Sequence, residues 1–353
     1  MPLAPPSRPE RMPTANPAKR LLGSFKELGL SAAQVRRLMP EWWDDAAAED
    51  DGGLLELQIL LARRLNVALE SLQSAIPHPA FRETSQRFKT VHPEGSSQLA
   101  VAASIGHGLA QLLASANASV KVTTPVDAPA LRARMLREAG GAITLDCLCQ
   151  YLWRCGRPVV HVTQWPTGLR RPDAMCVRVG PRPVIMVVRK EVAPAKLAFL
   201  VAHEVGHDMC GHLQDASNAV LVDDALPVDA QQSFFDADER QADAYAMELL
   251  GGQTLRVACE SIRGPSYSEL TLAVAALRAC EGKALDAGQV ILGWARLTQD
   301  WKLANLALRY LQTMQAAPVV INDVAAAHID ESALSADGRD HLMRLTGMEL
   351  PAA

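Results

Sequence analysis

Two histidines four residues apart, with a glutamate directly after the first, form the most chemically specific pattern in the chain: His203-Glu204-Val205-Gly206-His207. At 3.6 residues per turn, positions four apart lie on one side of a helix, so both imidazoles point the same way. Neutral imidazole is a good ligand for Zn²⁺, which in catalytic sites takes three protein ligands and keeps one position open. Glu204 can then take a proton from water that the metal activates for attack on a peptide carbonyl. The pattern predicts a zinc site with His203 and His207 as ligands and Glu204 as the catalytic base.

A surface helix that carries two histidines by chance is the competing interpretation. The neighbouring residues Phe199, Val201 and Val205 are apolar, so the helix is expected to be largely buried. Buried histidines and carboxylates need polar partners, because an unpartnered polar group in an apolar interior costs free energy. A metal ion is the partner that suits this donor set, and we expect Zn²⁺ as the cofactor.

The third ligand is expected from a second helix, over residues 234–250. Glu239 and Asp243 lie four residues apart and share a helix face, whereas Glu248 falls on a different one. An HExxH followed downstream by ExxxD resembles thermolysin-type zinc peptidases, and this implies Glu239 as ligand and Asp243 as the residue that orients a ligand histidine. The competing interpretation is an exposed acidic helix start, which the helix dipole favours. The acidic residues of the segment are Asp236, Asp238, Glu239, Asp243 and Glu248.

His212 and a group of cysteines offer alternative metal ligands. The longer HExxHxxGxxH pattern would place its third histidine at position 213, which is Leu213, so a capping or solvent-exposed role is expected for His212. Cys147, Cys149 and Cys155 lie close together, but their spacing differs from the paired CxxC of structural zinc sites. We expect these cysteines to be free thiols buried on a helix.

The composition is typical of a folded protein in a reducing compartment. Hydrophobic residues make up 49% of the 353 residues, which is enough for a sizeable core. The net charge of -4 creates no global field that would attract nucleic acid. The seven cysteines lack a disulfide-type spacing, the start has no apolar signal region, and the apolar runs are shorter than a membrane span. The sequence therefore predicts a cytoplasmic protein without membrane contact.

The chain is expected to divide into segments around a central α+β unit. Three β-branched runs, PVVHV, MCVRVG and RPVIMVVR, precede the histidine helix, which favours a short sheet packed on that helix. The flanking regions show mostly helical periodicity. The expected boundaries are 1–18 for a flexible proline-rich arm, 19–78 for a helix-turn-helix-like domain, 79–135 for a helical linker region, 136–255 for the zinc metallopeptidase domain and 256–353 for a C-terminal helical region.

Residues 145–251 resemble the ImmA/IrrE family of bacterial metallopeptidases on several segments in fixed order: CLCQYLWRCGRPVVHVTQWP, RPVIMVV, LAFLVAHEVGHDMCGHL, LVDDA and DERQADAYAMELLGG. The resemblance implies a small zincin-like α+β peptidase domain with His203, His207 and Glu239 as ligands and Glu204 as base. It also implies a partner, because members of this family cleave helix-turn-helix repressors and thereby relieve repression of stress or mobile-element genes.

The N-terminal segment 19–78 resembles the helix-turn-helix domains that are often joined to this family, on SFKELGLSAAQVRRLM and LLELQILLARRLNVALESL. Ser31 is expected to cap its second helix. The recognition-helix position holds PEWWDDAAAEDDGG, which has six acidic residues to repel phosphates and no Arg, Asn or Gln to contact bases. DNA contact therefore has little support, and we expect Trp42 and Trp43 in the core or against a protein partner.

More than one class of function remains open from the sequence alone. The first is a zinc endopeptidase that cleaves a transcriptional repressor or a similar regulatory protein. The second is a transcriptional regulator or protein-binding module in which the zinc domain is a scaffold or sensor, since the helical flanks together exceed the peptidase-like segment in length. A third is hydrolysis of something other than a peptide, because an activated water is not selective by itself.

Overall fold

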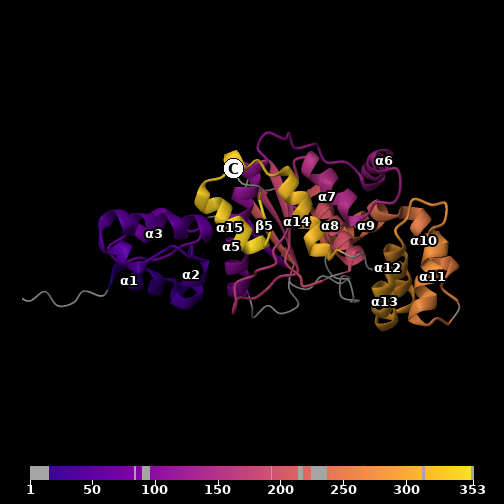
Figure 1. Cartoon of the computed structure of the whole chain (residues 1–353), viewed down its shortest axis with the longest axis horizontal. Helices are drawn as coiled ribbons and strands as arrows, with labels where there is room; N and C mark the ends of the chain where they lie inside the picture. Colours follow the sequence, from indigo (N-terminus) through magenta and orange to yellow (C-terminus); the bar gives the residue numbers. More distant parts are fainter. Residues whose placement is uncertain are drawn as a thin grey trace, which may run out of the picture. The chain divides into compact units, whose positions relative to one another are not determined.

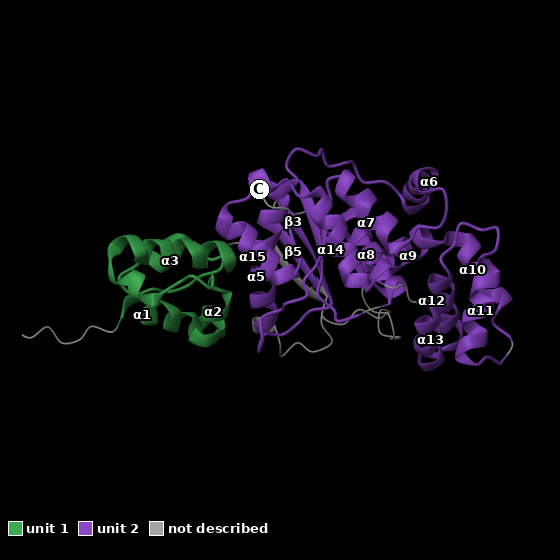
Figure 2. Cartoon of the chain, viewed as in Figure 1, with its two compact units in different colours: residues 1–82 green, residues 83–353 purple. Residues whose placement is uncertain are grey.

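The computed structural model describes residues 16–82, 85–89, 96–191, 193–213, 218–223, 237–264, 266–311 and 315–350. The chain forms two compact units, residues 1–82 and residues 83–353 (Figure 2). Residues 1–15 of the expected flexible arm lie outside the described residues. Pro17 and Ala18, also expected in that arm, instead open the first helix, because the side chain of Asn16 caps it.

The first unit consists of short helices around an apolar core. Ser31 caps the second helix through its side chain and Gln34 completes a capping box, which confirms the predicted cap. At the expected recognition-helix position, residues 45–49 form a 3-10 helix and residues 51–53 form the first turn of the next α-helix. Trp43 is buried beside the 3-10 helix, whereas Trp42 is 54% exposed. The elements are α1 (Pro17–Ser24), η1 (Phe25–Leu28), α2 (Ala32–Leu38), η2 (Asp45–Glu49), α3 (Asp51–Arg64) and α4 (Leu69–Gln73).

The second unit surrounds a five-stranded sheet with helices and confirms the expected α+β class (Figure 1). The strand order is β1-β5-β3-β4-β2; β3 runs antiparallel to both of its neighbours, and the outer pairs are parallel. The strands are β1 (Ser85–Lys89), β2 (Val159–His161), β3 (Ala174–Val179), β4 (Arg182–Val187) and β5 (Asn218–Asp223). The helices are α5 (Ser96–Ala116), α6 (Ala128–Ala139), α7 (Leu145–Arg154), α8 (Pro194–Met209), α9 (Ala237–Leu250), α10 (Gly252–Ser261), α11 (Glu269–Cys280), α12 (Ala287–Thr298), α13 (Trp301–Leu308), η5 (Arg309–Leu311), α14 (Ala317–His328), η6 (Glu331–Ala333) and α15 (Ala336–Thr346).

Helices cover both faces of the sheet. Every residue of β2 and β4 is buried, as expected for strands without a solvent-facing side. Both α5 and α8 contact β3 and β4, and Figure 2 shows these two helices on either side of the strands. The histidine-bearing helix α8 is therefore a core helix fixed on the sheet, and Figure 1 shows it beside α9.

Helix α5 is the described helix that is long and apolar enough to cross a membrane, over Gln98–Ala116. However, 72% of that window is buried inside the unit. Packing against the sheet accounts for its apolar composition.

The ranges expected as linker region, peptidase domain and C-terminal region lie in this second unit, except for residues 79–82, which belong to the first. Helix α5, from the expected linker, packs on the sheet, and α14, from the C-terminal range, packs on β2 and α7. Asn322 of α14 accepts a hydrogen bond from the backbone N–H of His161 at 2.8 Å and donates to its carbonyl at 2.9 Å. The indole of Trp153 donates to the carbonyl of Val159 at 3.0 Å. Side chains thus satisfy backbone groups of β2 that face away from β4.

Candidate metal centre

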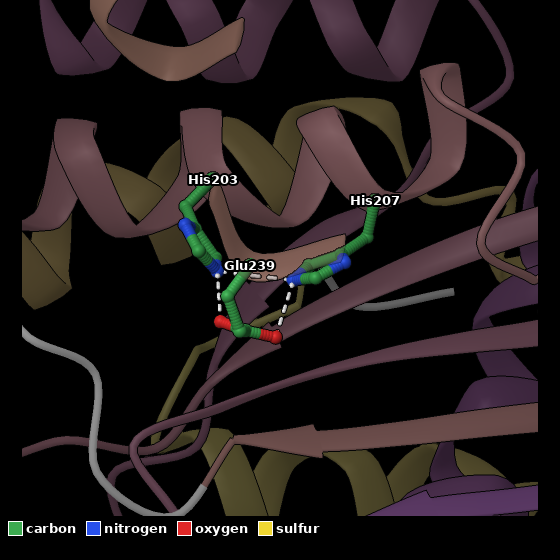
Figure 3. Close-up of side chains that lie close together, drawn as sticks. All are labelled: His203, His207 and Glu239. Carbon is green, nitrogen blue, oxygen red and sulfur yellow. Dashed lines mark hydrogen bonds and ion pairs between the residues drawn. The ribbon is translucent and has the colours of Figure 1, made fainter. Parts of the chain in front are cut away.

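His203, His207 and Glu239 converge from two helices (Figure 3). The histidines lie on α8, and Glu239 lies in the first turn of α9. The two histidine Nε2 atoms are 3.0 Å apart; Glu239 Oε2 is 3.2 Å from His203 Nε2, and Glu239 Oε1 is 3.5 Å from His207 Nε2. In the part of the chain that the structure describes, this is the group of side chains placed to hold a metal ion.

The spacing and the surroundings of this group fit a zinc ion. Donor atoms at about 2.0–2.1 Å from a tetrahedral ion are separated by about 3.3 Å, close to the 3.0–3.5 Å observed here. Both histidine side chains are 0% exposed and the Glu239 side chain is 11% exposed. Two imidazoles and one carboxylate are also the donor set of open catalytic zinc sites. Both the donor spacing and the donor types therefore fit a zinc ion.

The carboxylate of Asp243 lies next to the ring of His203. Its Oδ1 atom lies 2.9 Å from His203 Nδ1. Where the carboxylate accepts this hydrogen bond, Nδ1 of His203 donates it and Nε2 is left to present its lone pair to His207 and Glu239. Asp243 is one turn after Glu239 on α9. The ExxxD spacing thus places Glu239, which faces both histidines, and Asp243, which contacts His203, on one face of the helix.

If His203, His207 and Glu239 hold a metal ion, replacing Asp243 by Ala is expected to weaken metal binding about 10- to 100-fold, because His203 loses the group that orients its ring. Competition with a chromophoric chelator measures the affinity. Asp243→Asn is the matched control, since its amide oxygen still accepts the hydrogen bond and should retain most of the affinity. Equal affinity in Asp243→Ala and the wild type would exclude the orienting role.

Gly206, inside the histidine motif, sets the distance between the two site helices. A Cβ atom at this position would lie 2.9 Å from both the Cα and the carbonyl oxygen of Ala242 and 3.2 Å from the Cβ of Tyr245. The Ala242 atoms belong to the backbone of α9, so no rotamer change can move them aside. The close approach permitted by glycine lets Glu239 reach the histidines of α8.

Buried polar contacts hold both site helices to the segment before α6. Asp208, next to His207, accepts a hydrogen bond from Arg157 Nε at 2.7 Å, and Arg157 also donates to the side chain of Thr123 at 2.7 Å. Tyr245 of α9 donates to the carbonyl of Val126 at 2.9 Å, and burial raises the pKa of its phenol. These contacts anchor α8 and α9 independently of any metal.

The remaining acidic candidates lie outside the ligand group. Glu204, the expected base, is on α8 between the two ligand histidines and is fully buried. Glu248 forms an ion pair with Arg256 at 3.1 Å. Asp238 is in the first turn of α9, with Oδ1 3.8 Å from His212 Nε2. Asp236 lies outside the described residues.

Of the two roles expected for His212, solvent exposure was wrong, whereas its backbone N–H does help to close α8 by donating to the carbonyl of His207 at 3.0 Å. The residue is 8% exposed, and its Nδ1 atom lies 2.7 Å from Nδ1 of His207. The chain turns back after α8 because Gly211 adopts a left-handed conformation with φ +86°, which places the next residue over the last helical turn. The sequence signal for this placement was the glycine directly before the histidine.

The cysteines of α7 and of the residue after it do not form a second metal site among the described residues. Cys147, Cys149 and Cys155 are free, as expected, but only Cys149 is fully buried. Burial raises the pKa of the Cys147 and Cys149 thiols, which favours neutral thiols over metal-binding thiolates.

The structure brings the three predicted ligands together. Comparison with known proteins tests the family to which the sequence pattern pointed. A model of the family described as Peptidase U49 matches residues 146–281, which include both ligand histidines, Glu204 and Glu239. No curated protein and no solved structure matches the chain.

The expected membership of the ImmA/IrrE family is wrong, because the matching model belongs to a different peptidase family. An HExxH helix followed by an acidic helix reflects the geometry of a metal site, and such a pattern does not separate one zinc peptidase family from another. The repressor substrate was implied by that resemblance and loses its support with it. The chain is similar to the Peptidase U49 family over residues 146–281, and this match supports proteolytic activity.

Proposed function

We propose that this protein is a zinc-dependent endopeptidase in which His203, His207 and Glu239 hold the metal and Glu204 is the general base. The observation that carries the proposal is the buried group of three ligand side chains with donor atoms 3.0–3.5 Å apart. The family match over the same residues gives independent support for peptide hydrolysis.

Each residue of the site has a separate task in this proposal. A bound zinc ion supplies Lewis acidity, which makes water acidic enough to be deprotonated near neutral pH and polarises a peptide carbonyl. Glu204 accepts the proton of the attacking water and delivers it to the nitrogen of the departing amine. Asp243 keeps the proton of His203 on Nδ1, away from the ligand group. Burial of both histidines and of Glu204 excludes bulk water, which strengthens electrostatic interactions in the site.

Metal content and peptide cleavage together test the proposal. We expect about one zinc ion per purified chain, because the proposed site has the three protein ligands that hold zinc in catalytic sites. Incubation with a proteome-derived peptide library should create new internal termini that mass spectrometry detects. A zinc chelator should abolish this cleavage, and added Zn²⁺ should restore it. Failure of the wild type to bind zinc would refute the metal site, whereas chelator-resistant cleavage would refute its catalytic role.

A further inference from the structure

A hydrogen-bonded chain of side chains extends from the ligand His207 to the surface of α9. Nδ1 of His207 lies 2.7 Å from Nδ1 of His212, and Nε2 of His212 lies 3.1 Å from Oε1 of Gln241. Oδ1 of Asp238 is 3.8 Å from His212 Nε2, beyond hydrogen-bond distance. His212 is thus in contact with one ligand and one surface amide.

The proposed metal site determines where the protons lie along this chain. Nε2 of His207 faces the ligand group, so it must present a lone pair and the proton must be on Nδ1. That proton is donated to Nδ1 of His212, which is therefore unprotonated. His212 then carries its own proton on Nε2 and donates it to the Gln241 oxygen. One tautomer of each histidine thus accounts for both hydrogen bonds between His207, His212 and Gln241.

We infer that His212 is a positioning residue for His207 and that Gln241 in turn fixes His212; this inference rests on the metal site of the proposed function. Asp243 performs the equivalent task for His203. The two ligand histidines therefore have different partners: a carboxylate holds one, and an imidazole holds the other. A metal-binding histidine carries its proton on the ring nitrogen that does not bind the metal. A group that accepts a hydrogen bond from this N–H fixes the orientation of the ring and increases its affinity for the metal.

The position of His212 depends on how α8 ends. The backbone N–H of His212 donates to the carbonyl of His207 at 3.0 Å, and the N–H of Gly211 donates to Asp208 at 3.1 Å. With Gly211 in the left-handed conformation, these bonds close the helix and bring the ring of His212 edge-on to the ring of His207, with the two ring centroids 5.0 Å apart. The backbone thus holds the positioning residue in place before any metal binds.

Zinc affinity of the full-length chain, measured by chelator competition, tests this role. His212→Ala should bind zinc about 10- to 100-fold more weakly than the wild type. His212→Asn should recover most of the affinity, because its Oδ1 atom takes the place of Nδ1 and accepts the same hydrogen bond. Gln241→Ala changes an exposed position, so the fold is preserved, and we expect a smaller loss of affinity.

A control variant and two spectroscopic measurements separate positioning from general destabilisation. His341→Ala removes an imidazole that is 2% exposed on α15 and should leave zinc affinity unchanged. In the cobalt-substituted protein, the visible absorption bands should shift in His212→Ala and not in His341→Ala. Nitrogen NMR of the wild type should show the proton of His212 on Nε2.

The outcomes distinguish this inference from the proposed function. A wild type that binds no zinc overturns both. A wild type that binds zinc, with unchanged affinity in His212→Ala and Gln241→Ala, overturns the positioning role and leaves the endopeptidase proposal intact. An equal loss of affinity in His341→Ala, or a proton found on Nδ1 of His212, also overturns it.

Discussion

The Glu204→Gln variant is expected to keep its zinc ion and its fold but to lose peptide hydrolysis. Gln has nearly the same shape as Glu, and its amide can neither accept the proton of an attacking water nor return it to the leaving amine. Removal of a general base typically lowers the rate about 10²- to 10⁴-fold. The rate at which new peptide termini appear gives the activity, while metal analysis and thermal unfolding report on the site and the fold.

Glu260→Gln is the matched control, because Glu260 is exposed on α10 and undergoes the same chemical change. It should cleave peptides like the wild type. Full activity of Glu204→Gln would rule out the assigned base. A zinc-loaded wild type without detectable cleavage would instead favour a scaffold or sensor role for the metal domain.

The Gly206→Ala variant is expected to destabilise the second unit and to disrupt the metal site together. An alanine in a helix interior normally stabilises a protein by about 0.5–1 kcal/mol relative to glycine. Here the new Cβ would lie 2.9 Å from backbone atoms of Ala242, so α8 and α9 must separate. Overpacking of this kind typically costs about 1–3 kcal/mol. Because Glu239 moves with α9, zinc affinity should fall as well, and a displacement near 1 Å can lower activity about 100-fold.

Gly23→Ala provides the control for this change. Gly23 is in α1, and beyond its chain neighbours and the backbone of its own helix no atom lies within 4 Å of the position that its Cβ would take. This variant should be as stable as the wild type or slightly more so, and its zinc affinity should not change. Denaturant unfolding and chelator competition measure both quantities. If Gly206→Ala matched the wild type in both, the close approach of α8 and α9 would not be needed for the site.

Local patterns were sufficient to predict three adjacent strands and the two site helices. The runs around Val160, Val177 and Ile185 are rich in β-branched residues and are bounded by turns, and they form β2, β3 and β4. Strand β1 was not predicted because SQRFK contains no apolar run. Its partner is β5, at residues 218–223, so this pairing depends on tertiary structure that no local pattern records.

The site was predictable where it depends on helical periodicity. Residues four apart share a helix face, and this rule alone pairs His203 with His207 and Glu239 with Asp243. The role of His212 requires a left-handed turn that reverses the chain, and the periodicity ends where that turn begins. The importance of Gly206 likewise appears only when α9 lies against α8, because it depends on a distance between two helices.

The side chains that hydrogen-bond to the outer backbone groups of β2 restrict how the sheet can interact with other polypeptides. An exposed strand edge is a template for pairing with a further chain, either in aggregation or in recognition of an extended peptide. At β2 the outward backbone groups of Val159 and His161 already bond to Trp153 and Asn322. No incoming strand can hydrogen-bond there without displacing these side chains. An extended polypeptide that joins this sheet must therefore add at its opposite end, alongside β1.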